Sequence, residues 1–158
     1  MNPQLKEILN YQGKEFAMDC DPLNQYLSKM NSPIHFIPNI KYNERGYLGK
    51  WAVLKNGLHL IDFIGVLENR NEIFLDNLFP DKQTVFAEWF TGEIILTQGK
   101  LLALKSKYSL AVYEKDLHLD FINGRLIRTY IVENTRDSIS GFFDNLQYGG
   151  GKVRLMWK

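Results

Sequence analysis

The sequence contains one cysteine among 158 residues, so no disulfide can form within the chain. Cys20 stands between Asp19 and Asp21. Two neighbouring carboxylates raise the pKa of a thiol and disfavour the reactive thiolate. We therefore predict that Cys20 is a structural residue and not a nucleophile.

Long apolar runs are also lacking. The longest have four residues, as in Trp51–Leu54 and Leu101–Leu104, whereas a membrane-spanning helix needs about 20. The first residues are polar and do not show the basic-then-apolar order of a signal peptide. These features predict a cytoplasmic protein that does not associate with membranes.

No charge of one sign dominates, because 19 Lys and Arg face 18 Asp and Glu and leave a net charge of +1. A nucleic-acid-binding protein needs a basic field. A modest basic–aromatic patch is present, but Glu114 and Asp116 interrupt it, so we predict no nucleic-acid binding. The patch consists of Lys100, Lys105, Lys107, Lys115, Tyr108 and Tyr113.

The chain does have abundant apolar residues, at 45% with 13% aromatic. This is enough to bury one core, so we expect a single domain over residues 1–158. Asn56-Gly57 and Asn123-Gly124 stand between apolar-rich arms and predict tight hairpin turns, because both residue types tolerate positive φ. Gln98-Gly99 is a looser example of the same pattern.

Three such turns predict a mainly β fold, an antiparallel meander closed as a barrel or as a two-layer sandwich, with an α+β fold as the alternative. Apolar side chains at 117, 119 and 121 alternate with His118 and Asp120, as in a strand with one buried face. Arg128 interrupts the arm after Gly124, so the register of that hairpin stays open.

Helices are few. Asp21 as cap, Pro22 at the first position and an apolar stripe at Leu23, Tyr26, Leu27 and Met30 predict a helix over 22–30. Residues 3–10 are expected to form a frayed turn. Residues 71–80 fit a short helix or a strand, and the helix is favoured. The Gly- and Asn-rich segment 134–152 is expected to be a loop, and 153–157 an edge strand.

Three residues are candidates for chemistry. His59 and His118 each stand in a Leu-His-Leu tripeptide, and Asp120 follows His118 on the same strand face. Two imidazoles and a carboxylate can ligate a metal, and a His–Asp pair can act as a general base. The alternative is that these are solvent-facing strand positions. Tight metal-ligand spacing is missing, so we predict no metal site and no cofactor.

Carboxylates form a loose group in the same part of the sequence: Glu88, Glu93, Glu114, Asp116 and Asp120. We interpret them as solvated side chains, because the sequence does not define the separation that a catalytic pair needs. Aromatic residues are denser than a small core requires. Trp51 and Phe86 are assigned to the core, while Tyr47 and Trp89 are candidate contacts for a protein partner.

Four segments carry a resemblance to a family. They are Gly46-Tyr47-Leu48-Gly49-Lys50-Trp51, Leu78-Phe79-Pro80, the stretch Val85–Ile94, and Gln98-Gly99-Lys100-Leu101-Leu102. Together they resemble a group of small bacterial proteins that share a Gly-Tyr-x-Gly-x-Trp and Phe-Ala-x-Trp-Phe-x-Gly pattern. In this chain the final element, Tyr108 to Leu117, departs from the family spacing. The resemblance covers about residues 46–124 and implies a bacterial origin, but no activity.

Missing catalytic signatures and surplus aromatics favour a non-catalytic module that recognises another protein, as an immunity-like partner of a toxin or as an accessory subunit. The alternative is a small enzyme or a metabolite- or metal-binding barrel with a pocket at His59, His118 and Asp120. Association of the chain with itself is a third possibility, since an exposed edge strand permits it.

Overall fold

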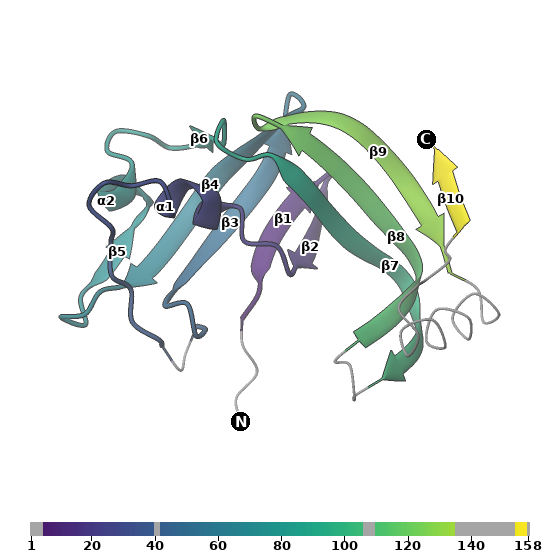
Figure 1. The fold of residues 1–158 in the computed structure, drawn as a ribbon, viewed down its shortest axis with the longest axis horizontal. Coiled ribbons are helices and arrows are strands. Elements are labelled where there is room, and N and C mark those ends of the chain that lie inside the picture. Colours follow the sequence, from purple (N-terminus) through teal and green to yellow (C-terminus); the bar gives the residue numbers. More distant parts are fainter. Residues whose placement is uncertain (1–4, 40–41, 106–109, 135–153, 158) are drawn as a thin grey trace. The chain divides into compact units, whose positions relative to one another are not determined.

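The computed structural model describes residues 5–39, 42–105, 110–134 and 154–157 (Figure 1). In these residues it has ten strands and two short helices. Their order along the chain is β1 (Glu7–Tyr11), β2 (Lys14–Met18), α1 (Leu23–Leu27), β3 (Tyr47–Leu54), β4 (Gly57–Val66), β5 (Glu72–Phe74), α2 (Leu75–Leu78), β6 (Val85–Phe86), β7 (Gly92–Lys105), β8 (Leu110–Ile122), β9 (Arg125–Glu133) and β10 (Arg154–Trp157).

Hydrogen bonding connects the strands in the order β2-β1-β3-β4-β9-β8-β7, with β5 and β6 also on β4 and β10 on β9. The mainly β prediction is confirmed. The barrel prediction is wrong for the described residues, because β2 and β7 end this order and do not pair. A purely antiparallel meander is also wrong, because β1 pairs with β3 in parallel. The sandwich and α+β alternatives stay predictions.

Two predicted hairpins are present. Asn123 and Gly124 have φ of 47° and 79° and form the turn between β8 and β9. The β3–β4 turn is shifted by one residue, since Lys55 and Asn56 carry the positive φ and Leu54 pairs with Gly57. Gly57 lies close to the Phe86 ring, since a Cβ added there would stand 3.0 Å from it and the ring would have to shift.

The hairpin predicted at Gln98-Gly99 is wrong, because β7 continues through it. Gly99 has φ of 85°, and the next amide, Lys100 N–H, donates to the Glu114 carboxylate at 2.6 Å. A glycine inside a strand often marks such an irregularity, since only glycine adopts this φ without strain. The Gln98-Gly99 pattern therefore marks a distortion within β7 and not a hairpin turn.

The N-terminal predictions need correction. The frayed turn over 3–10 is wrong, because Glu7–Tyr11 is a strand paired with β2. The helix over 22–30 is real but covers only Leu23–Leu27, and Asp21 does not cap it with its side chain. Instead, the Asp21 carboxylate accepts a hydrogen bond from the Tyr47 hydroxyl, so a tertiary contact replaces the local cap.

Segment 71–80 contains both predicted alternatives, a strand at β5 followed by α2. The change occurs where the Asn77 side chain accepts the Phe74 N–H at 2.8 Å and starts the helix. The predicted C-terminal edge strand is present as β10, which pairs antiparallel with β9. The predicted loop over 134–152 lies outside the described residues except for Asn134.

Contacts divide the chain into two compact units. The first comprises Met1–Gly92 with Phe121–Leu126, and the second comprises Glu93–Asp120 with Ile127–Lys158. Leu9, Trp51, Leu58, Leu60 and Phe63 are buried in the first unit. In the second, Ile94, Leu96, Leu117, Leu119 and Ile131 are buried. The prediction of one domain over 1–158 stays a prediction. Neither helix of the described part has the length and apolarity needed to cross a membrane.

Candidate functional site

A groove of about 780 Å³ lies within the first unit. Its walls come from α1 and the residues after it, from residues between α2 and β6, and from β6 and the residues after β6. The apolar part of the lining consists of Tyr26, Met30, Phe79, Val85, Phe86 and Trp89, and the polar part includes Lys29, Lys82, Thr84 and Glu88. We call this the aromatic groove.

Three half-buried rings form one wall of the aromatic groove. The Tyr26 ring packs edge-on against Phe79 and Trp89, with centroid distances of 5.0 and 4.9 Å. Phe79 and Trp89 are nearly parallel, 5.9 Å apart. The Trp89 indole N–H donates to the Pro22 carbonyl at 2.9 Å, which fixes the ring. The wall is thus an apolar surface held in place before anything binds.

Local sequence explains how the wall is held. Gln25 on α1 bonds Thr91 at two points: its side-chain amide donates to the Thr91 carbonyl at 2.9 Å and accepts the Thr91 N–H at 3.1 Å. This clamp ties α1 to the chain just after Trp89. Pro80 follows Phe79 and prevents α2 from continuing past the groove. The sequence predicted an apolar stripe that includes Tyr26 and Met30, and both residues line the groove.

Charge at the groove is mixed, with two exposed lysines, Lys29 and Lys82, and one exposed carboxylate, Glu88. Trp89, a predicted partner contact, belongs to the wall of the same groove. Tyr47, the other predicted partner contact, is only 5% exposed, so a partner can reach little of it. The two residues therefore occupy different environments.

Tyr47 belongs to a buried polar network in the same unit. Its hydroxyl donates to the Asp21 carboxylate, and the Arg45 guanidinium lies 3.4 Å from Asp21 and 3.4 Å from Glu7. Glu7 is 1% exposed. Its two oxygens accept the Gly49 N–H at 2.5 Å and the Trp51 indole N–H at 3.1 Å. Sequence reasoning missed this network, since Glu7 looks like an ordinary N-terminal carboxylate.

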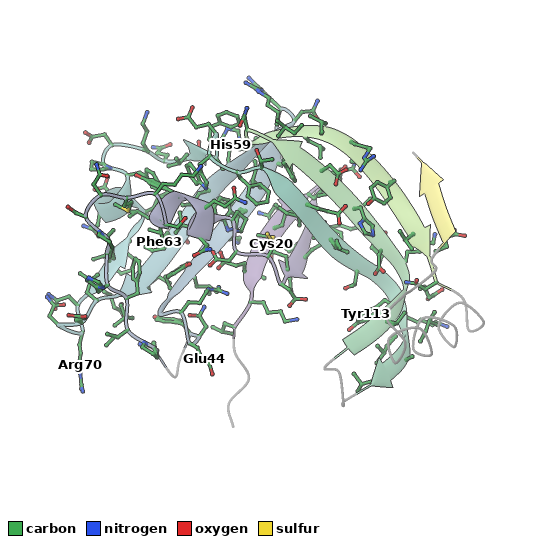
Figure 2. The ribbon with its side chains drawn as sticks, viewed as in Figure 1. Cys20, Glu44, His59, Phe63, Arg70 and Tyr113 are labelled. Carbon is green, nitrogen blue, oxygen red and sulfur yellow. The ribbon has the colours of Figure 1, made fainter. Side chains whose placement is uncertain are left out.

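Burial has the largest effect on the pKa values of Glu7, Tyr47 and Cys20 in and beside this network. It raises the pKa of Glu7 from 4.5 to about 7, although the bonds from Gly49 and Trp51 act in the opposite direction. Burial and the bond to Asp21 raise the pKa of Tyr47. Burial, with Asp21 and Glu7 nearby, raises the pKa of Cys20 to about 11. Cys20, which is labelled in Figure 2, is thus held as a thiol, in agreement with the sequence prediction.

The second unit carries a polar cluster across β7, β8 and β9. Nδ1 of His118 lies 3.1 Å from one oxygen of Glu93, and the Tyr130 hydroxyl donates to the other oxygen at 2.8 Å. The His118 and Tyr130 rings stack at 4.5 Å. The approach of Nδ1 to Glu93 meets an ion-pair distance but not hydrogen-bond geometry. A carboxylate behind an imidazole is an arrangement that orients a proton-transfer group.

Asp120 does not pair with His118 as the sequence suggested. Its partner is Arg128, whose Nε donates to the carboxylate at 2.6 Å. The Arg128 guanidinium also lies over the Tyr130 ring, 5.1 Å from its centre. Desolvation and the bond to Glu93 raise the pKa of Tyr130 to about 12. The sequence placed Glu93 only in a loose group of carboxylates, and it missed Tyr130.

His59 belongs to the first unit. Its Nδ1 donates to the Gly57 carbonyl at 3.0 Å, and its ring packs against Phe86. The contacts of His118 and Asp120 lie in the second unit. None of the contacts seen for the three candidates joins His59 to the other two. No group of three or more His, Cys, Asp or Glu side chains in the described part of the chain is placed to hold a metal ion.

No protein-family model, curated protein or solved structure matches the chain. The family resemblance carried by residues 46–124 therefore stays a prediction. Among the candidate sites, the aromatic groove combines a defined volume with a rigid apolar wall and charged residues at its edge.

Proposed function

We propose that this protein is a binding module that holds an extended segment of a partner protein in the aromatic groove. The observation that carries the proposal is the fixed wall of Tyr26, Phe79 and Trp89. Aromatic side chains anchored in place are typical of binding hot spots, because little side-chain entropy is lost when a partner docks.

The groove chemistry indicates the kind of segment. The wall favours one aromatic or large aliphatic side chain of the partner, which would pack on Trp89 and Phe79. Lys29 and Lys82 are exposed and exceed the single carboxylate of Glu88 among the charged lining residues. Charge complementarity therefore favours acidic residues on either side of the apolar anchor. A toxin or a larger complex that this protein accompanies is a suitable source of such a segment.

A displayed library of random peptides, selected on the purified protein, tests the proposal. We expect enrichment of peptides with one aromatic or aliphatic anchor flanked by Asp or Glu. Reversing both charges in a Lys29→Glu, Lys82→Glu variant should weaken the selected peptide about tenfold, since exposed ion pairs contribute roughly 0.5–1 kcal/mol each. Kd is measured by fluorescence anisotropy.

Lys115→Glu is the matched control, because it reverses an exposed lysine on β8, in the other unit. Its Kd should equal that of the unmodified protein at near-physiological salt. The proposal is wrong if selection yields no common pattern, or if both variants bind the selected peptide equally. Trp89→Ala is a poorer test, because loss of the bond to Pro22 would also loosen α1.

The other functional hypotheses remain predictions. A small enzyme or a metabolite- or metal-binding protein that uses His59, His118 and Asp120 stays the alternative prediction, and the contacts of His59 lie in the first unit while those of His118 and Asp120 lie in the second. Self-association, a cytoplasmic location, a bacterial origin and the absence of nucleic-acid and membrane binding also stay predictions.

A further inference from the structure

Glu7 is a buried carboxyl group with a route to solvent. A cavity of about 280 Å³ is lined by Glu7 together with Lys6, Asp19, Asn43 and Arg45. Two of the lining residues, Lys6 and Asp19, are exposed to solvent and form an ion pair at 2.9 Å. A proton can therefore reach Glu7 without unfolding of the strand that carries it.

Two short chains of contacts connect Glu7 to the aromatic groove. In the first, Glu7 accepts the Trp51 indole N–H at 3.1 Å, and the buried Trp51 ring packs edge-on against Trp89 with centroids 6.5 Å apart. In the second, Arg45 contacts both Glu7 and Asp21, and Asp21 precedes Pro22, whose carbonyl holds the Trp89 indole. Both chains end on the same ring of the groove wall.

The charge of the network changes with one proton. Asp21 and Arg45 are of opposite sign, so protonated Glu7 leaves the three groups neutral, and ionised Glu7 leaves one buried negative charge. Ionisation strengthens the pull of Glu7 on the Trp51 N–H, because a bond to a charged acceptor is stronger. It also draws Arg45 from Asp21, whose second oxygen is buried without a hydrogen bond. Cys20 and Tyr47, which also face this network, stay protonated at neutral pH.

We infer that protonation of Glu7 regulates the aromatic groove by shifting Trp89 through Trp51 and through Arg45, Asp21 and Pro22. This inference rests on the proposed function for its consequence in binding, but the movement of Trp89 is a property of the protein alone. A titratable network that biases a ligand site is a recognised form of regulation.

The test is fluorine NMR of the full chain labelled with 5-fluorotryptophan, recorded across a pH titration from mildly acidic to mildly basic. The chain has three tryptophans, and single Trp→Phe variants assign their signals. We expect the Trp89 signal to shift with a midpoint near pH 7, at the same pH as the carboxyl carbon of Glu7 in a sample labelled with ¹³C-glutamate. In a Glu7→Gln variant the Trp89 signal should not titrate.

His59 is the main competing group, because it packs on Phe86 at the groove. His59→Asn keeps a donor for the Gly57 carbonyl and removes the titration of the imidazole. If the Trp89 shift persists in Glu7→Gln and disappears in His59→Asn, the inference is wrong and His59 is responsible. It is also wrong if Glu7 titrates in the unmodified protein while the Trp89 signal does not shift, a result that does not depend on the folding of either the Glu7 or the His59 variant.

Binding separates this inference from the proposed function. With the selected acidic peptide, Kd should differ about fivefold between pH 6 and pH 8, a usual size for coupling between sites, and Glu7→Gln should remove the difference. If the peptide binds tightly at every pH and the Trp89 signal does not shift with pH, the inferred regulation is wrong and the proposed function still stands. If the Trp89 signal shifts with pH but no peptide binds, the proposed function is wrong, and the coupling between Glu7 protonation and Trp89 still stands.

Discussion

Between pH 4.5 and pH 8, the unmodified protein should lose about 3 kcal/mol of stability relative to a Glu7→Gln variant. Burial raises the pKa of Glu7 from 4.5 to about 7, and this difference corresponds to about 3 kcal/mol. The folded state holds the proton more tightly than the unfolded state does. The stabilisation is therefore complete below pH 4.5, decreases as the pH rises to 7, and is absent above that pH.

Urea unfolding of both proteins at several pH values measures this difference. Taking the difference between the two proteins removes the contributions of all other titrating groups, provided the slopes with urea agree. The Glu7→Gln substitution places an amide N–H against Gly49 or Trp51, so the variant is expected to be less stable at acid pH. Only the change with pH matters. A constant difference across the range would show that the pKa of Glu7 is not raised in the folded state.

Gly46→Ala should destabilise the protein by about 4 kcal/mol, whereas Gly13→Ala should cost about 1 kcal/mol. Both glycines have positive φ, at 81° and 78°. An added Cβ at Gly46 would stand 2.1 Å from the Ile37 carbonyl oxygen, while at Gly13 nothing lies within 4 Å. The two substitutions share the backbone strain and differ in crowding.

Thermal and urea unfolding of the two variants at mildly acidic pH compares them directly. The clash at Gly46 is with backbone that is itself bonded, since Ile37 N–H donates to the Val66 carbonyl and Val66 N–H donates to the Gly46 carbonyl. Movement that relieves the clash therefore breaks the hydrogen bonds that hold the end of β4 to its neighbours. Equal losses for the two variants would mean that strain alone accounts for Gly46 and that Ile37 yields easily.

Local chemistry was the reliable part of the sequence. Asn123-Gly124 sets a tight turn through its own φ preference, and so it was predictable without any other contact. The same preference misled at Gly99, because positive φ is compatible with a turn and with a distorted strand. There, Glu114 decides the outcome by bonding the Lys100 amide from the neighbouring strand.

The candidate residues show the same division. The sequence selected Trp89, His118 and Asp120 by residue type and placed His118 correctly on a strand with one buried face. The sequence did not predict which side chains these residues contact. Glu93 approaches His118 and Arg128 takes Asp120, because hydrogen-bonded strands bring together residues that no spacing rule relates.

The sequence by itself determined a mainly β chain with two tight hairpins, because these depend on residues close in the chain. Tertiary structure alone decided the parallel pairing of β1 with β3 and the burial of Glu7 against Gly49, 42 positions away. It also decided the hydrogen bond from the Trp89 indole to the Pro22 carbonyl, 67 positions away. Such contacts form only when the chain closes long loops, and the preferences of single residues carry no information about which distant group will be met.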